Sequence, residues 1–371
     1  MQSVLFIAIL CVLLASCYVL VRYGSARLEG ANPVSLFTFI AILFTSGLDV
    51  GLIMFPLTEF PIYEREPAYQ FSNPLSVAFG FWGFLIWAFY FLTTFYFCAI
   101  EPHVRLFEKP LIKLVNNIVI IGTCAFTGFL FLSYLPSYID GISPFWQYSL
   151  VITITLLAVL SSADIRYVKV LSVSSTCVFI VLIVVMWATT NQGLSGLGSN
   201  LMLVSEYFSQ VHHFVKPVSD YHAFYLFWWF SWSIMIGQFV ARFVGGLRTW
   251  QLLLALLVFP SIPIALWFSV LYYYHTNSIE LFAMRNVAMI VVGVIFVTNS
   301  LDSLIRLYTD NLKLSVDRVG FLPYVILNFV VIFGLIVLYQ LTPLKIEWVG
   351  LVVIALYALI CLLLAKRAFV H

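Results

Sequence analysis

Two aromatic stretches decide how this chain is interpreted, and the first reads Trp82-Gly83-Phe84-Leu85-Ile86-Trp87-Ala88-Phe89-Tyr90. The second reads Phe227-Trp228-Trp229-Phe230-Ser231-Trp232. Aromatic faces inside a membrane protein can surround a cation that has no N–H group to donate, and quaternary ammonium groups are the usual ligands of such cages. Tryptophan also gathers in belts at membrane interfaces. Either stretch alone would fit a belt or helix packing, but the pair favours a binding site.

The composition around these stretches indicates an all-α membrane protein. Of the 371 residues, 63% are hydrophobic and 9% are charged, against about one quarter charged in soluble domains. Apolar runs long enough to cross about 30 Å of hydrocarbon recur along the chain. We expect transmembrane helices at 1–21, 34–56, 75–99, 112–134, 144–163, 168–189, 222–245, 249–273, 281–301, 320–341 and 345–366. Only the connection 190–221 is long enough for an additional element, an external loop or amphipathic segment.

Basic residues are concentrated in alternate loops. Fourteen of the eighteen form one set: Arg22, Arg27, Arg105, Lys109, Lys113, Arg166, Lys169, Arg242, Arg248, Arg306, Lys313, Arg318, Lys366 and Arg367. Cytoplasmic loops carry such an excess of lysine and arginine. The pattern therefore predicts a cytoplasmic C-terminus and, with eleven spans, an external N-terminus.

Other function classes find little support in the sequence. The six cysteines fall within apolar runs without metal-ligand spacing, which is typical of small packing residues. The sequence contains no phosphate-binding glycine loop and no convincing pair of nucleophile and base. Because the charges are confined to loops, the weakly basic balance does not indicate a nucleic-acid partner. We therefore do not expect an enzyme.

The order of the helices indicates an internal repeat. A leading helix and loop, 1–33, precede five helices in 34–189 and five more in 222–366, and a short tail, 367–371, follows. An odd number of helices per half gives the halves opposite orientations, as in inverted-repeat transporters. In that architecture the first helix of each half is broken near the midplane. The segment Ser46-Gly47-Leu48-Asp49-Val50-Gly51 interrupts the first of these helices, and the second aromatic stretch lies in the other.

Four motifs in order resemble one known family. G-M-G-I-G-L-M-F followed by E-P looks like Gly47–Met54 with Glu59 downstream, and W-x4-W-x2-Y matches Trp82, Trp87 and Tyr90. F-Y-W-x-W-W-x-S-W-S-P resembles residues 224–234, and F-F-V-T-S-A-D-S resembles residues 296–303. These are motifs of the betaine/choline/carnitine transporters. The chain resembles a shortened, divergent member of that family, and the resemblance implies a leucine-transporter-like fold.

The resemblance implies six aromatic substrate-binding residues: Trp82, Trp87, Tyr90 and Trp229 as a central cage, with Trp228 and Trp232 along the same path. On one uninterrupted helix, positions 82, 87 and 90 would fall within about 140° of one side. A desolvated cation–π contact contributes about 2 kcal/mol, so several rings would give useful and reversible affinity. Helix packing is the alternative role for Trp228 and Trp232.

A coupling ion is the only cofactor that we expect. In sodium-coupled members of the family, backbone and hydroxyl oxygens hold one ion, and the positions that match here are Thr45, Leu48, Phe296, Asn299 and Ser300. Asn299 stands where the family has threonine, and its side-chain oxygen is a suitable ligand for a hard cation.

Asp49 departs from the family pattern, which has glycine at this position. An ionisable side chain near the midplane is costly and is a functional hypothesis by default. Three functional roles are open to Asp49: it carries a coupling proton, it is the counter-charge to a positively charged substrate, or it is an additional ligand of sodium. The structural alternative is a pair with a neighbouring helix. Because an ionised Asp49 would repel the carboxylate of betaine or carnitine, electrostatics favours a cationic substrate such as choline.

Two further charged residues have simpler explanations. Asp302 follows the helix at 281–301 and precedes Arg306 by four residues, a spacing that predicts an ion pair. Arg242, at the cytoplasmic end of its helix, suits both the excess of internal positive charge and a gate contact.

The sequence therefore predicts a secondary-active importer of a quaternary ammonium compound in a bacterial inner membrane, coupled to sodium or protons. Its partners would be this small molecule and the lipid bilayer, with a homotrimer or a larger membrane complex as the assembly. The alternative is a divergent member that binds its ligand without transporting it, as a sensor or as a membrane subunit of a complex.

Overall fold

The structure is a computed structural model that describes residues 2–48, 51–164, 166–279 and 283–368. Within these residues, ten helices are long and apolar enough to cross a membrane, and the bent pair α2–α3 would make an eleventh span. The prediction of an all-α membrane protein with about eleven spans is therefore confirmed. The division into two five-helix repeats stays a prediction.

The elements follow one another as α1 (Gln2–Tyr23), β1 (Arg27–Glu29), α2 (Leu36–Gly47), α3 (Gly51–Arg65), α4 (Pro74–Trp82), α5 (Leu85–Ala99), α6 (Glu101–Val104), α7 (Pro110–Tyr134), α8 (Pro144–Ser162), α9 (Arg166–Ala188), α10 (Leu194–Val204), α11 (Glu206–Phe214), α12 (Asp220–Ala241), β2 (Gly245–Arg248), α13 (Thr249–Thr276), α14 (Ala283–Leu312), α15 (Val316–Val319), α16 (Phe321–Leu341) and α17 (Ile346–Ala368). Short 3₁₀ turns at Pro67–Tyr69 and Leu135–Ser137 connect helices, and β1 pairs antiparallel with β2.

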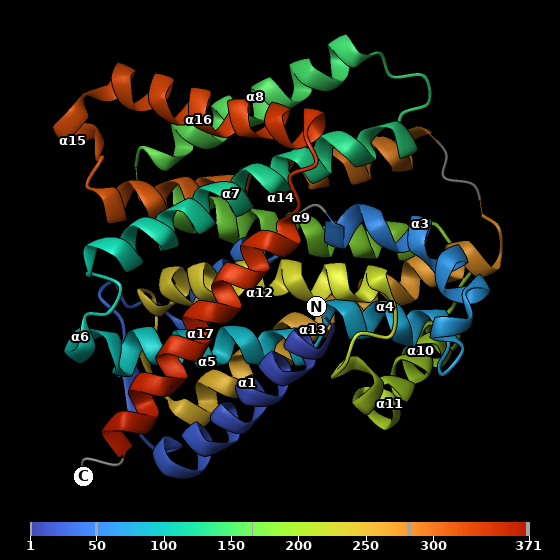
Figure 1. The fold of residues 1–371 in the computed structure, drawn as a ribbon. Coiled ribbons are helices and arrows are strands. Elements are labelled where there is room, and N and C mark those ends of the chain that lie inside the picture. The colour runs from blue at the N-terminus through green and yellow to red at the C-terminus, as the bar shows by residue number, and fades with distance from the viewer. Residues whose placement is uncertain (1, 49–50, 165, 280–282, 369–371) are drawn as a thin grey trace.

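Helix α12, which carries the second aromatic stretch, lies at the centre of the bundle (Figure 1). It packs against α5 and α17, and it also contacts α2, α7 and α14. Nearly the whole of α12 is buried, whereas α16 covers α7 and α8 and keeps much of its surface exposed. A helix that is apolar on all sides is suited to such a central position.

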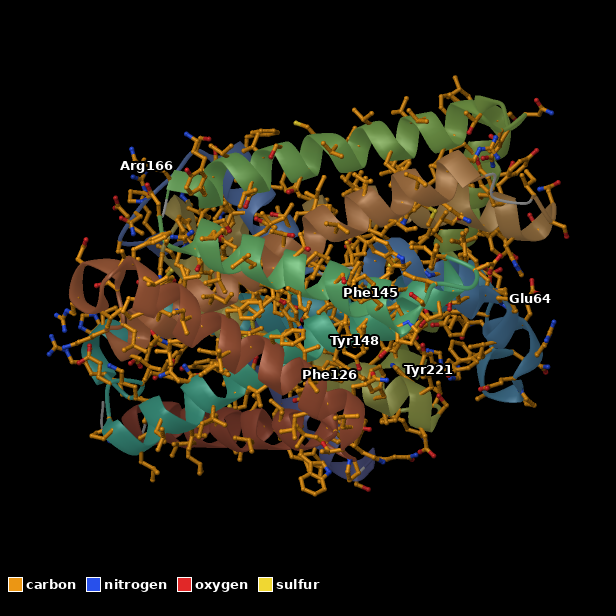
Figure 2. The ribbon with its side chains drawn as sticks, turned by 90° about the horizontal axis from the view of Figure 1, so that it is seen from above. Glu64, Phe126, Phe145, Tyr148, Arg166 and Tyr221 are labelled. Atoms are coloured by element: carbon orange, nitrogen blue, oxygen red, sulfur yellow. The ribbon has the colours of Figure 1, made fainter. Side chains whose placement is uncertain are left out.

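The loops divide between two ends of the bundle. Figure 2 shows Arg166 at one end and Glu64 at the opposite end. In Figure 1, α6 and α15 lie at the end that carries the basic loops, which we call the basic end. The segment 190–221 supplies α10 and α11 toward the other end. There the Glu206 carboxylate accepts a hydrogen bond of 2.7 Å from the Asn73 side chain at the start of α4, and this bond lowers the pKa of Glu206.

Most of the predicted helix ranges agree with the structure, and three do not. The predicted helix 34–56 is interrupted and continues to Arg65, and the predicted helix 75–99 is interrupted after Trp82. The predicted helix 281–301 runs on to Leu312, and positions 281 and 282 lie outside the described residues. Glu59 and Asp302 lie beyond the predicted ends of two of these helices, and both are buried with polar partners.

The close packing of α12 on α5 at Thr93 depends on Gly237. A Cβ atom at this position would lie 2.2 Å from Thr93 Oγ1 and 2.8 Å from the Thr93 carbonyl carbon. Because the backbone of α5 cannot yield as a flexible side chain can, we expect Gly237→Ala to destabilise the protein by about 1–3 kcal/mol, the usual cost of overpacking. The measurement is thermal unfolding of the purified protein in detergent.

Gly334 provides the matched control for this substitution. It lies inside α16, and a Cβ atom there would meet nothing within 4 Å. Alanine is favoured over glycine in a helix interior by about 1 kcal/mol, so Gly334→Ala should leave the melting temperature unchanged or raise it. Equal effects of the two substitutions would contradict the close-packing explanation.

Candidate binding site between two broken helices

The break between α2 and α3 leaves carbonyl oxygens without helical partners, and side chains from other helices bind them. The two helices are bent by 54° relative to one another across residues that include Asp49, which lies outside the described residues. Tyr90 donates a hydrogen bond of 3.1 Å from its hydroxyl to the carbonyl oxygen of Gly47. Ser300 donates one of 2.8 Å to the carbonyl oxygen of Leu48. The break is therefore held by α5 and α14.

A second free carbonyl arises from a proline inside α3. Pro56 has no N–H group, so the carbonyl oxygen of Leu52, four residues earlier, has no helical donor. Trp267 of α13 supplies one, because its indole nitrogen donates a hydrogen bond of 2.9 Å to this oxygen. Sequence reasoning missed Trp267. The signal was Pro56 itself, because a proline within a transmembrane helix requires a donor from elsewhere.

The first aromatic stretch also contains a helix break. Helix α4 ends at Trp82 and α5 begins at Leu85, with Gly83 and Phe84 between them. Phe84 adopts a positive φ of 44°, and its N–H group donates to the Ser261 hydroxyl at 3.3 Å. The prediction that positions 82, 87 and 90 share one uninterrupted helix is therefore wrong. The backbone turn at residues 83–84 decides where these rings point.

Two of the predicted cage tryptophans bind carbonyl oxygens at this break. The indole nitrogen of Trp87 donates to the carbonyl oxygen of Trp82 at 3.1 Å, and that of Trp229 donates to the carbonyl oxygen of Phe81 at 2.7 Å. Both oxygens would otherwise lie buried without a donor, which is costly in an apolar interior. These tryptophans therefore stabilise the broken helix in addition to any contact with a ligand.

The structure brings three of the predicted tryptophans into direct contact. Trp82 packs edge-to-face on Trp229, with ring centroids 5.1 Å apart, and on Trp228 at 5.6 Å. Trp228 and Trp229 stack at 5.1 Å. Phe55 of α3 adds edge-to-face and tilted contacts to Trp82 at 6.0 Å and Trp228 at 6.1 Å. We call these four side chains the ring cluster, and it joins α3, α4 and α12.

The remaining predicted aromatic residues lie beside the ring cluster. Trp87 and Tyr90 form an edge-to-face pair of their own at 5.2 Å. Both rings lie close to Gly47, because a Cβ atom at that position would be 3.3 Å from ring atoms of each. Trp232 is buried one turn further along α12, and among the described residues its indole nitrogen has no hydrogen-bond partner. All six predicted side chains are buried, and their role in substrate binding stays a prediction.

Of the five residues predicted to hold sodium, Thr45, Leu48 and Ser300 lie together between α2 and α14. The Ser300 hydroxyl lies 3.4 Å from the carbonyl oxygen of Thr45 as well as 2.8 Å from that of Leu48. Phe296 is buried on the same helix, one turn before Ser300. Both polar atoms of the buried Asn299 side chain lack a hydrogen-bond partner among the described residues. Carbonyl, hydroxyl and amide oxygens are ligands that a small hard cation prefers, so the chemistry of these residues fits such an ion.

The corresponding helix of the second half is not broken. Helix α12 runs without interruption from Asp220 to Ala241, although the inverted-repeat architecture has a break there. Its residues Trp228 and Trp229 are large, and their rings fill the space beside α4. An unbroken α12 therefore presents side chains, rather than free backbone groups, to the site.

Glu59, which follows the glycine-rich motif in the sequence, is a buried acidic residue for which the sequence predicted no role. Its Oε1 atom accepts hydrogen bonds from the hydroxyls of Tyr221 and of Tyr225, the latter at 2.5 Å. Its Oε2 atom accepts one of 2.9 Å from Tyr63. In Figure 2, Tyr221 lies nearer to the end that carries Glu64 than to the end that carries Arg166. The signal was the pair of tyrosines four residues apart in the first turns of α12.

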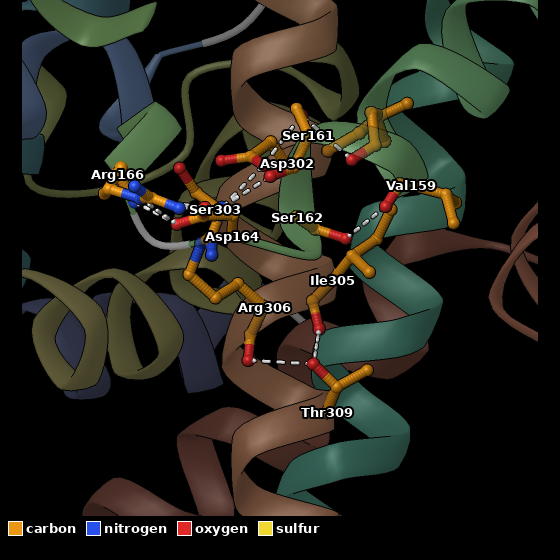
Figure 3. Close-up of polar contacts among 12 residues, drawn as sticks. Val159, Ser161, Ser162, Asp164, Arg166, Asp302, Ser303, Ile305, Arg306 and Thr309 are labelled. Carbon is orange, nitrogen blue, oxygen red and sulfur yellow. Dashed lines mark hydrogen bonds and ion pairs between the residues drawn. The ribbon is translucent and has the colours of Figure 1, made fainter. Parts of the chain in front are cut away.

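The predicted ion pair between Asp302 and Arg306 is confirmed. Asp302 Oδ1 lies 3.0 Å from Arg306 Nη2 and accepts a hydrogen bond of 2.8 Å from the Ser161 hydroxyl. Figure 3 shows this contact joining α8 and α14 near the basic end. Arg242 also forms an ion pair, with Asp310 at 2.6 Å. The Arg242–Asp310 pair joins the end of α12 to α14, and a gate role for Arg242 stays a prediction.

The fold and the site define a class: a multi-pass membrane protein with an interrupted helix and an aromatic cluster at its centre. A family model described as the betaine/carnitine/choline family of transporters matches residues 105–280. In fold, the chain is similar to a structure described as the substrate-bound outward-open state of a Na⁺-coupled sialic acid symporter. That similarity has a TM-score of 0.53 and 15% identity, and it covers 94% of this chain and 84% of the other.

Two curated relatives have names that specify a substrate. The chain is 23% identical over 294 residues to glycine betaine transporter OpuD of Bacillus subtilis, which covers 63% of this chain and 54% of the relative. It is 25% identical over 301 residues to glycine betaine transporter 1 of Vibrio parahaemolyticus, with 67% and 56% covered. The chain thus spans about half the length of the curated relatives it matches. Over part of its length the chain is therefore similar to betaine/carnitine/choline transporters, the family that its motifs resemble.

Proposed function

We propose that this chain imports a quaternary ammonium compound by secondary-active transport. The observation that carries the proposal is the ring cluster, since Trp82, Trp228 and Trp229 meet at the end of α4, where the α4–α5 pair is interrupted. Aromatic faces attract a cation that offers no hydrogen-bond donor, and each desolvated contact contributes about 2 kcal/mol. The names of the two glycine betaine transporters support the same substrate class.

The site must open before it can bind a ligand. A cation between two rings lies within about 6 Å of each centroid, so its two flanking faces stand much further apart than the 5.1 Å that separates Trp82 from Trp229. The ring cluster is therefore in a closed arrangement, with its rings packed edge-to-face or stacked on one another. Opening would separate α4 from α12, and the break at residues 83–84 gives α4 a point about which to turn.

The coupling ion in this proposal is sodium or a proton. Thr45, Leu48, Asn299 and Ser300 would hold sodium through carbonyl, amide and hydroxyl oxygens, which are the ligands that hard cations prefer. The Na⁺-coupled symporter of similar fold supports this assignment. Asp49 is the candidate for a proton, because an ionisable side chain in the middle of a membrane is usually functional.

The membrane orientation follows from charge. The basic end would face the cytoplasm, which places the start of α12, Glu59 and α10–α11 toward the outside of a bacterial inner membrane. The path from outside would then pass Glu59 before it reaches the ring cluster.

Uptake of radiolabelled choline and glycine betaine into proteoliposomes tests the proposal. With an imposed sodium gradient, we expect wild-type uptake to exceed uptake without a gradient by at least tenfold, and Ser300→Ala to abolish the sodium-driven part while Asp49→Gly retains it. If a proton gradient drives uptake, Asp49→Gly should abolish it and Ser300→Ala should retain it. Each variant is thus the control for the other.

The rival function is ligand binding without transport, as in a sensor or a membrane subunit of a complex. The closed ring cluster is compatible with that function, because a sensor also binds and releases its ligand. Saturable choline binding in detergent, together with no uptake under either gradient, would contradict transport and support the rival.

A further inference from the structure

Three amide side chains join α12 to two neighbouring helices at the basic end. Gln238 of α12 accepts a hydrogen bond of 3.0 Å from the Asn116 side chain of α7. It donates one of 3.2 Å to the Asn311 side chain of α14. Asn116 is buried, and Gln238 and Asn311 are half-buried. We call these three side chains the amide cluster, and neither the ring cluster nor the predicted sodium site includes them.

The amide cluster lies between the candidate site and the basic end. Gln238 follows Trp229 of the ring cluster by nine residues, which is about 14 Å along α12. Asn311 follows Ser300 by eleven residues, which is about 16 Å along α14. A path from the site along α12 to the basic end therefore passes the amide cluster.

Amide side chains suit a contact that opens and closes. In alternating access, one group of helices rocks against another around a fixed site, so the contacts of α12 at this end have to break in one state. Neutral hydrogen bonds are exchanged for bonds to water when a contact opens, so each favours the closed state by a factor of roughly ten or less. An amide left unpaired inside the closed bundle is much more costly than one in water. The cluster therefore holds the end closed only while its members are paired.

The ion pair one turn further out is a weaker contact. The side chains of Arg242 and Asp310 are 23% and 45% exposed, and water and salt screen ion pairs at such positions. Asn116, by contrast, is 2% exposed. The loss of the amide cluster should therefore affect the closure of α12 more than the loss of this ion pair.

We propose that the amide cluster is a latch, which closes the basic end around the site and opens to water during transport. The latch rests on the proposed function, because alternating access is what requires this end to open. Replacing Gln238 by an apolar residue leaves Asn116 and Asn311 unpaired in the closed state and hydrated in the open one, so the population shifts toward the open state. The alternative is a structural tie, whose loss lowers stability without admitting water.

Thiol reactivity at position 120 tests the latch without measuring uptake. Ile120 is fully buried and lies one turn deeper than Asn116 on the same face of α7. With the six native cysteines replaced by alanine, Ile120→Cys provides a single thiol, which a charged reagent reaches only through water. We expect Gln238→Leu to raise the rate of its modification in lipid nanodiscs by about tenfold.

Asn328→Leu is the matched control. Asn328 is also a buried amide, but it belongs to α16 and accepts a hydrogen bond of 2.5 Å from Tyr308 of α14. Its replacement removes a buried polar contact that does not involve α12. We therefore expect Asn328→Leu to lower the melting temperature and to leave the modification rate of Ile120→Cys unchanged.

Two outcomes overturn the latch: an unchanged rate in Gln238→Leu, or equal increases in Gln238→Leu and Asn328→Leu. If Gln238→Leu does not fold, Asn311→Leu takes its place, because it removes one bond of the cluster from a half-buried position, and the same two outcomes decide. The proposed function is judged separately by uptake. A wild type without uptake overturns transport whatever the thiol rates are, whereas uptake with an unchanged rate in Gln238→Leu overturns the latch alone.

Discussion

Replacing Trp229 by leucine should weaken the binding of choline by roughly 30-fold. The Trp229 ring stacks on Trp228 and meets Trp82 edge-to-face, so its loss removes one aromatic face from the site. A desolvated cation–π contact contributes about 2 kcal/mol, and each 1.4 kcal/mol corresponds to a factor of about ten. The measurement is equilibrium binding of radiolabelled choline to purified protein in detergent.

A phenylalanine at the same position is the matched control. Both substitutions remove the indole N–H group that donates to the carbonyl oxygen of Phe81, so both disturb the break between α4 and α5 to the same extent. Phenylalanine retains an aromatic face, and we expect Trp229→Phe to lose much less affinity than Trp229→Leu. Equal losses would show that Trp229 acts only through its hydrogen bond, and the cage hypothesis would then be wrong for this residue.

A neutral ligand adds a second control. The carbon isostere of choline, with a tert-butyl group in place of the trimethylammonium group, has the same shape and no charge. Its binding should differ little between the leucine and phenylalanine variants, because the ring quadrupole attracts only the cation.

The helices could be predicted from the sequence because apolar length alone identifies a membrane span. The ends of the helices were less predictable where charged residues are buried. Asp302 was taken to follow a helix, but its carboxylate is bound by Ser161 and Arg306, so α14 continues past it. A carboxylate that finds partners on a neighbouring helix cannot be distinguished in sequence from one that begins a loop.

The members of the aromatic site could be predicted, but their contacts could not. The positions of Trp82 and Trp87 were predicted on one uninterrupted helix, whereas α4 ends at Trp82 and α5 begins at Leu85, with Gly83 and Phe84 between them. A single glycine in an apolar run is usually tolerated within a helix. The positive φ of Phe84 depends on partners such as Ser261, which is distant in sequence, so the ring contacts follow from tertiary structure.

Removing Asp302 alone should destabilise the protein by about 3–5 kcal/mol, the usual cost of leaving one partner of a buried ion pair uncompensated. Of the two side chains, 5% of Arg306 and 0% of Asp302 is exposed, so water cannot solvate the arginine that Asp302→Ala leaves behind. Arg306 would keep its hydrogen bond of 2.9 Å to the carbonyl oxygen of Ser161, which compensates only part of the charge. The measurement is the free energy of unfolding in mixed detergent micelles.

The double variant Asp302→Leu with Arg306→Met decides whether the pair itself stabilises the fold. Two apolar side chains of similar size need no desolvation of charge, and such replacements are often neutral or stabilising by about 1–4 kcal/mol. The Ser161 hydroxyl would keep a partner, because it also donates to the carbonyl oxygen of Ala158 at 3.0 Å. We therefore expect the double variant to be at least as stable as wild type and more stable than either single variant. A double variant as unstable as Asp302→Ala would instead show that the pair, through Ser161, is what joins α8 to α14.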